Sequence, residues 1–218
     1  MKKQLFVGAI ALFVSLSFAN AQGIGIFGGV NFQNLNGKGA GGNKLDNQII
    51  PGFHAGISAQ LPLVPEFFIQ PGLLFSTKGG KDEGIFVPTT YRLSYIELPL
   101  NLVYKGQLGN GFVMVGFGPY IAYAVGGKVA IETGGATTKA DIEFQNTVEA
   151  SDPLAVVYFR ALDAGGNIFA GYEMANGVFF QLNTQLGMLK INPEDRRFPE
   201  NEGFIKNTGF GLSLGFRF

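Results

Sequence analysis

Strict alternation of apolar residues with polar or small ones is the feature that most constrains this chain. In residues 207–218, Phe or Leu occupies every second position from Phe210 to Phe218, with glycine, serine and arginine between them. A β-strand places successive side chains on opposite faces, so the pattern predicts a strand with one apolar and one polar face. Seven further segments repeat it, at 24–33, 53–61, 67–78, 95–105, 113–125, 162–173 and 178–188. The chain is therefore predicted to be all-β, with eight strands.

The links between these segments alternate in length. Short links with turn residues lie near 62–65, 106–110 and 175–177, and long links lie near 34–50, 79–90, 127–157 and 192–206. Antiparallel strands then collect the short turns and both termini at one end, and the long loops at the other. This is the layout of an eight-stranded antiparallel up-and-down transmembrane β-barrel of the outer-membrane type.

The start of the chain carries the parts of a secretory signal peptide. A lysine pair precedes an apolar run over residues 5–18, and residues 19–21 form an A-x-A cleavage pattern. The run is shorter than the ~20 residues that a membrane-spanning helix needs, which disfavours an uncleaved anchor. We expect residues 1–21 to be a cleaved signal peptide and residues 22–218 to form the barrel domain.

Composition indicates which face of the barrel points outward. Charged residues make up only 15% of the chain, against roughly 25–35% of the surface of a soluble domain. A soluble barrel of the lipocalin type would expose its polar face, but that face is mostly Gly, Ser, Ala, Asn and Gln here. The apolar face carries aromatic residues toward both strand ends, like the girdles of a membrane barrel. We expect the apolar face to contact lipid and the polar face to line the lumen.

The polar face is predicted to hold a network of ionisable side chains inside the barrel. Its members are His54, Lys78, Glu97, Lys105, Asp163, Glu173 and Arg217. Three cations balance three carboxylates, so we expect them to pair and fill the lumen, with an ion pathway as the alternative. Pro99 and Pro119 lack a backbone donor and are expected to mark a bulge or bend. Gly116→Ser on this face is expected to be far milder than Leu98→Arg on the apolar face.

The composition also limits the chemistry. A net charge of zero provides no basic surface for nucleic acid. With no Cys and one His, the chain lacks the ligands of common zinc sites, and we expect neither a metal nor another cofactor. His54 and Ser58 share a strand face, and Asp163 on another strand could complete a hydrolase-like trio. Because these side chains would point into the lumen, we expect no catalytic role.

Several segments carry a family resemblance. They are GGVNFQNL (28–35), FFIQPGLLFSTKGGK (67–81), YIELPLNLVYK (95–105), GFGPYIAYAVGGK (116–128), Asp163-Ala164-Gly165 and the tail GFGLSLGFRF. In this order they resemble the PorT-type outer-membrane β-barrel family of Bacteroidetes, across essentially all of residues 22–218. The terminal Phe218 looks like the C-terminal aromatic signal of such barrels. The resemblance implies the fold and the outer-membrane location, and the family is functionally diverse.

These observations predict an outer-membrane protein of a Gram-negative envelope with a structural or interaction role. Its surroundings would be outer-membrane lipid and lipopolysaccharide, and its long loops would meet an envelope protein partner. We expect a monomer. A small transport barrel is the first alternative, and an envelope lipid-modifying enzyme is a weaker one.

Overall fold

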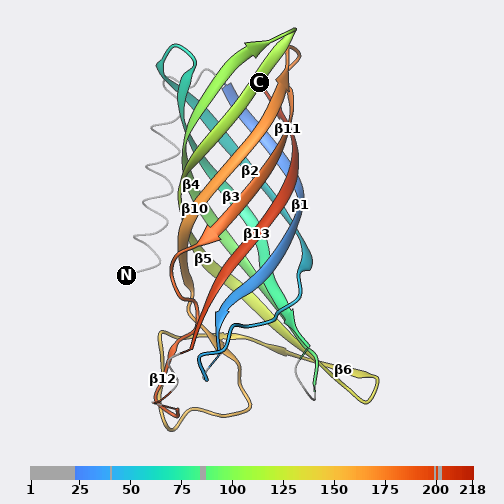
Figure 1. Ribbon diagram of the computed structural model, residues 1–218, viewed down its shortest axis with the longest axis vertical. Helices are drawn as coiled ribbons and strands as arrows, with labels where there is room; N and C mark the ends of the chain where they lie inside the picture. The colour runs from blue at the N-terminus through green and yellow to red at the C-terminus, as the bar shows by residue number, and fades with distance from the viewer. Residues whose placement is uncertain (1–22, 40, 84–86, 199, 201–202) are drawn as a thin grey trace.

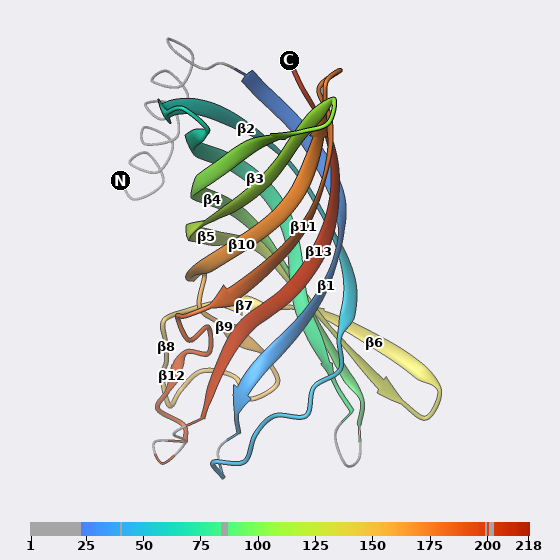
Figure 2. The same cartoon turned by 45° about the horizontal axis from the view of Figure 1, so that its top comes forward.

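The computed structural model describes residues 23–39, 41–83, 87–198, 200 and 203–218. Within these ranges, eight long strands wind around one axis as a tilted, closed barrel (Figures 1 and 2). They are β1 (Gly23–Lys38), β2 (Ile50–Val64), β3 (Phe67–Asp82), β4 (Thr89–Leu108), β5 (Gly111–Thr133), β10 (Leu162–Met174), β11 (Val178–Gly187) and β13 (Phe204–Arg217). The predicted signal peptide, residues 1–21, lies outside the described residues. The described part contains no helix that is long and apolar enough to span a membrane.

The barrel closes through the pairing of its first and last strands. All neighbouring long strands are antiparallel and follow chain order, and Gly25 of β1 is opposite Arg217 of β13. Leu162 of β10 is opposite Tyr123 of β5 across the long link between them. The prediction of an eight-stranded antiparallel up-and-down barrel is confirmed.

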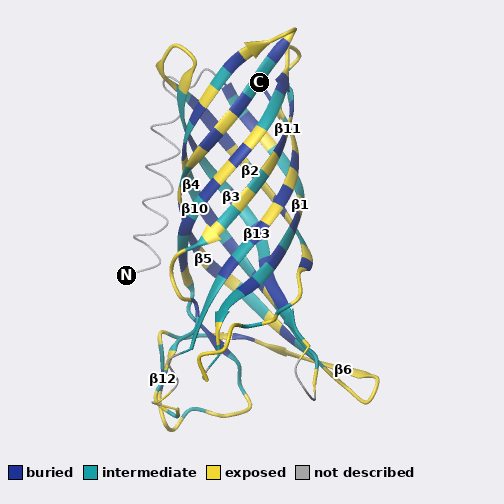
Figure 3. Ribbon diagram, in the orientation of Figure 1, coloured by how far each residue is buried: buried dark blue, intermediate teal, exposed yellow. Residues whose placement is uncertain are grey.

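Burial alternates along each strand as the sequence predicts (Figure 3). In β13, Leu212 and Leu214 are 51% and 65% exposed, whereas Ser213 between them is 4% exposed. Large apolar side chains cover the outer surface, and most of the buried polar residues lie on the opposite face of the strands. The interior of this barrel is therefore largely polar, and its exterior is apolar.

The long links contain more regular structure than the sequence predicts. They include β6 (Ala136–Asp141), β7 (Glu143–Phe144), β8 (Thr147–Val148), β9 (Tyr158–Phe159) and β12 (Glu194–Asp195). The predicted 127–157 loop is wrong at its start, because β5 runs on to Thr133 and forms a hairpin with β6 that leaves the barrel wall (Figure 2). Hydrogen bonds along the strand pair satisfy the backbone there without support from the barrel.

The remainder of the two longest links forms a cap at the loop end of the barrel. We use "cap" for residues 142–161 and 188–198. In the cap, β7 pairs with β9 and β8 pairs with β12, both in parallel. Ile142, Phe159 and Ile191 are 5%, 3% and 0% exposed, and they form one apolar cluster with Leu93 and Leu35 of the barrel strands. Apolar packing thus joins the cap to the barrel end.

Neither proline marks a register shift, so the predicted bulge is absent at both positions. The register is the same at Pro99↔Tyr120 and Leu102↔Phe117, and the shift between β4 and β5 lies at Ser94/Tyr95. The ring of Pro99 is accommodated by Gly72, where an added Cβ would lie 3.0 Å from the Pro99 Cγ. A missing donor can be tolerated because the pairs on both sides of it hold the register.

Candidate functional site

The candidate site is the lumen, where the structure gathers the six predicted charges into two groups. The loop-side cluster comprises Lys78, Glu97 and Asp163, and the turn-side cluster comprises Lys105, Glu173 and Arg217. Each group draws its members from three strands. His54, the seventh predicted residue, belongs to neither ion-pair group and lies in a polar cavity of its own.

In the loop-side cluster, one ammonium group lies between two carboxylates. Lys78 Nζ is 3.1 Å from Glu97 Oε1 and 3.2 Å from Asp163 Oδ2, and all three side chains are at most 1% exposed. Lys78 Nζ also lies 4.3 Å from the centre of the Tyr120 ring. Because ions this deeply buried lose their hydration, such a group is stable only if other donors compensate for it.

Neutral donors supply that compensation. Tyr120 Oη donates to Asp163 Oδ2 at 3.2 Å, and Asn207 Nδ2 donates to the same oxygen at 3.0 Å. Gln185 Nε2 donates to Glu97 Oε2 at 2.8 Å. These residues share the inward parity of their strands, but the sequence alone does not show which of them meet.

The turn-side cluster contains two cations and one carboxylate, whereas the loop-side cluster contains one cation and two carboxylates. Lys105 Nζ is 2.6 Å from Glu173 Oε1, and Arg217 Nε is 2.9 Å from Glu173 Oε2. The Arg217 guanidinium also stacks over Phe179, 5.1 Å from the ring centre. All three ions line a hollow of about 340 Å³ at the short-turn end. Together the two clusters balance the charge of the lumen.

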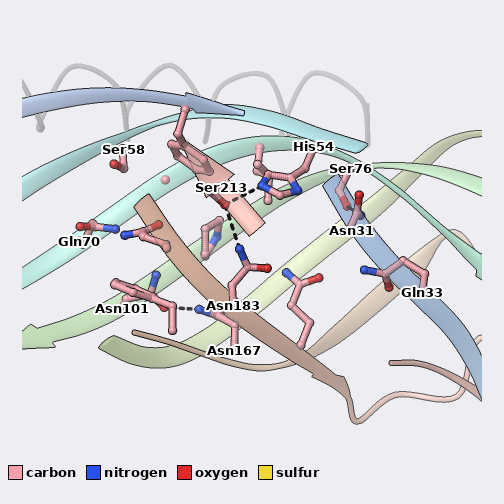
Figure 4. A pocket seen from close by; sticks show the side chains of 17 residues that line it. Asn31, Gln33, His54, Ser58, Gln70, Ser76, Asn101, Asn167, Asn183 and Ser213 are labelled. Atoms are coloured by element: carbon pink, nitrogen blue, oxygen red, sulfur yellow. Dashed lines mark hydrogen bonds between the residues drawn. The ribbon is translucent and has the colours of Figure 1, made fainter. Parts of the chain in front are cut away.

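A polar cavity of about 70 Å³ contains His54 (Figure 4). His54 Nε2 and Ser213 Oγ are hydrogen-bonded at 2.7 Å, and Asn183 Nδ2 donates to the same hydroxyl at 2.9 Å. Ser58 Oγ has no hydrogen-bond partner among the described residues. Asp163 bonds Lys78, Tyr120 and Asn207 instead of His54. The hydrolase-like trio of His54, Ser58 and Asp163 is therefore not assembled as a hydrogen-bonded unit.

The lumen also holds an apolar cluster that the sequence analysis did not predict. Val103, Met114, Phe169 and Phe179 are at most 5% exposed and pack with Phe27 and Phe68. The sequence does carry a signal for it. Phe27, Phe169 and Phe179 occupy the same alternate strand positions as the inward glycines and amides, so alternation places their rings inside the barrel. Apolar residues thus add to the side chains that fill the barrel.

Inward glycines make room for these rings. A Cβ added to Gly116 would overlap the ring of Phe169, and one added to Gly215 would overlap the ring of Phe179. This contact counts against the expectation that Gly116→Ser is far milder than Leu98→Arg, since an aromatic side chain already fills that space.

Metal ligation has no support in the described residues. They contain no group of three or more His, Cys, Asp or Glu side chains that could hold a metal ion. The carboxylates of the lumen instead bond ammonium, guanidinium, amide and phenol groups.

Comparisons with known proteins complete the description. The family model described as "Outer membrane protein beta-barrel domain" matches residues 17–191. Ail, the attachment invasion locus protein of Yersinia pestis, is 10% identical with a TM-score of 0.37, over 90% of this chain and 99% of Ail. Neisserial surface protein A is 11% identical with a TM-score of 0.44, over 89% of this chain and 97% of that protein. The search of curated proteins gave no match.

Proposed function

From the premise that this chain belongs to the outer membrane protein beta-barrel domain family, we propose that it is an interaction protein whose cap binds a partner. The protein lies in the cell outer membrane. In such barrels the short turns face the periplasm and the long loops face outward. The proposed binding surface would therefore face the cell exterior.

The observation that carries this proposal is that the cap is cross-linked by ion pairs. Arg196 Nη1 lies 3.0 Å from Glu149 Oε2, which joins the two long links. Arg197 Nη2 lies 2.7 Å from Asp195 Oδ2, and its Nη1 donates to Pro153 O at 2.7 Å. A surface held in one shape loses less conformational entropy on binding than a mobile loop does.

The cap also exposes apolar side chains beside these bonds. Leu154 is 75% exposed and Phe198 is 54% exposed, and they follow Pro153 and Arg197 directly in the chain. Aromatic residues and arginine are enriched among the residues that dominate binding energy at interfaces. We propose that this patch, Leu154 and Phe198 beside the braced Arg197, contacts an envelope or surface protein.

Site-specific photo-cross-linking in cells tests the proposal. A photoreactive residue at Leu154 should yield a discrete cross-linked product that is lost on Phe198→Ser. The same residue at Leu108, which is 59% exposed at the opposite end of the barrel, provides the matched control. An absence of product at Leu154, or a product that Phe198→Ser leaves unchanged, would contradict the proposal.

The contacts inside the lumen favour an interaction role over transport or catalysis. Ion pairs, amides and aromatic rings occupy the barrel interior, which favours a filled lumen over a pathway. The hydrogen bond from His54 to Ser213 favours a structural role for this histidine. We therefore propose that the protein is not an enzyme and acts as a monomeric barrel.

We further propose that the chain is a PorT-type member of the family, from Bacteroidetes. Support comes from the sequence segments, above all Glu97-Leu98-Pro99-Leu100 and Gly118-Pro119-Tyr120. An alignment with PorT-type sequences should place both motifs in shared columns. If unrelated outer-membrane barrels match them equally well, the assignment fails.

We also propose that residues 1–21 are a signal peptide that is cleaved on export. Cleavage after Ala21 would make Gln22 the first residue of the mature chain, directly before β1. N-terminal sequencing of protein extracted from membranes should begin at Gln22, and a sequence starting at Met1 would contradict cleavage.

A further inference from the structure

A groove of about 590 Å³ lies on the outer wall of the barrel near its loop end. Strands β2, β3, β4, β5 and β6 all contribute to it, where the β5–β6 hairpin turns away from the barrel (Figure 1). Its lining includes Phe53, Thr77, Arg92, Gly126, Lys128 and Asp141. The groove is separate from the lumen and from the proposed binding patch of the cap.

The strand register arranges the outer wall here in three successive rows. Farthest from the loops, a bulky row is set by the pairs Phe75↔Ile96 and Ile96↔Tyr123. A row of small side chains follows, set by Thr77↔Ser94 and Ser94↔Gly126. Arg92↔Lys128 and Lys128↔Asp141 then form a charged row. The groove is thus shallow over small residues, with bulky apolar groups on one side and two cations and the Asp141 carboxylate on the other.

The two cations keep bonding capacity toward the groove. Arg92 Nη1 donates to Pro51 O at 3.0 Å, which fixes the guanidinium along the wall and uses one of its five N–H donors. Lys128 Nζ lies 3.0 Å from Asp141 Oδ1, but these side chains are 69% and 81% exposed. An ion pair this exposed contributes little stability, so Lys128 can turn toward another anion.

We propose that this groove binds the phosphate-bearing headgroup of an outer-leaflet glycolipid of the lipid A type. Arg92 would form paired hydrogen bonds with phosphate oxygens, and Lys128 would add a second positive charge. The acyl chains would lie against the row containing Phe75, Ile96 and Tyr123. This apolar row favours a lipid over free phosphate, because only a lipid covers both the charged row and the apolar row.

Lipid binding by the purified full-length barrel in detergent micelles tests the proposal. The probe is bisphosphorylated lipid A, titrated against wild type and variants, with retention of the ligand followed by native mass spectrometry. Arg92→Gln should weaken binding about tenfold, since hydrogen bonds to charged groups are among the stronger ones. Gly126→Leu should weaken it as well by filling the groove, and an added Cβ there meets no heavy atom within 4 Å, so the fold should persist.

The matched control is Lys190→Gln, which removes an exposed cation outside the groove lining. It should leave the affinity within twofold of wild type. If Lys190→Gln and Arg92→Gln weaken binding equally, the attraction is non-specific and the site is refuted. If dephosphorylated lipid A binds as tightly as lipid A, recognition of the phosphate by Arg92 and Lys128 is refuted. If inorganic phosphate competes as well as lipid A itself does, a lipid site is refuted. Because purified protein is used, these outcomes are independent of cross-linking at the cap.

Discussion

Inside the barrel, glycine and phenylalanine form complementary pairs across neighbouring strands. Phe169 is directly opposite Gly116, and Phe179 is directly opposite Gly215. Gly215 is also opposite Phe27, whose ring centre lies 6.4 Å from that of Phe179. An eight-stranded barrel leaves an interior just wide enough for side chains, so the rings of Phe169 and Phe179 fit beside residues that have no side chain. The high glycine content thus has a packing role inside the lumen.

The loop-side cluster should be sensitive to loss of its single cation. Lys78→Met leaves Glu97 and Asp163 buried without their ammonium partner, and we expect a loss of about 3–5 kcal/mol in the free energy of unfolding. Urea unfolding in detergent micelles measures this. Lys128→Met, which breaks an exposed ion pair, is the control and should cost about 0–1 kcal/mol. Equal effects of the two substitutions would mean that the buried cluster is not coupled to folding.

At the scale of strands, a charge placed on the outward face of β4 should destabilise the barrel more the closer it lies to the middle of the membrane. Leu98 is opposite Ile121, which is 54% exposed on the outer wall near mid-strand. Leu98→Arg should cost about 2–4 kcal/mol when the protein refolds into lipid or micelles.

The control for this substitution lies on the same strand. Leu108→Arg is placed at the short-turn end, where a charge reaches water and should cost about 0–1 kcal/mol. If the two arginines destabilise the refolded barrel equally, the apolar wall does not face lipid.

The cap should loosen in acid, because protonation of Asp195 removes its ion pair with Arg197. The Arg197 side chain, through its hydrogen bonds, holds the pKa of Asp195 below its usual range. A depressed pKa in the folded state means that the stabilisation is present at neutral pH. It is lost as the pH falls below the usual aspartate pKa of about 4 and through the lowered value.

Hydrogen exchange across residues 188–198 measures this loosening. Protection factors, which are corrected for the intrinsic pH dependence of amide exchange, should fall between about pH 5 and pH 3 in the wild type. Asp195→Asn should exchange faster at neutral pH and lose most of the pH dependence. An unchanged pH profile in Asp195→Asn would assign the acid response to another group.

Much of the barrel follows from parity, but contacts between distant strands do not. Alternation places Lys78 and Asp163 on inward faces, since each occupies the same alternate positions as the other polar residues of its strand. Their meeting depends on the stagger of strands β3 and β10, which are not neighbours in the sheet. The cap was missed for a different reason, because β7, β8, β9 and β12 have only two residues each and show no period.

At the scale of the whole molecule, the filled lumen predicts electrical behaviour. Reconstituted in planar bilayers, the protein should show no steady, porin-like conductance. The loop-side cluster, the inward aromatic rings and the cap lie in series along the same axis, and separating buried ion pairs is unfavourable. A stable large conductance of the unmutated protein would contradict this prediction and favour the transport alternative.

The pairing of β1 with β13 has a consequence for the timing of biogenesis. The seam joins the two strands farthest apart in the sequence, and contacts of such long range are slow to form because a long segment must first be closed. The penultimate residue, Arg217, also supplies an ion pair to Glu173. The barrel can therefore close only after its last strand has been made and exported, and until then the chain carries open strand edges, which are prone to pair with other chains.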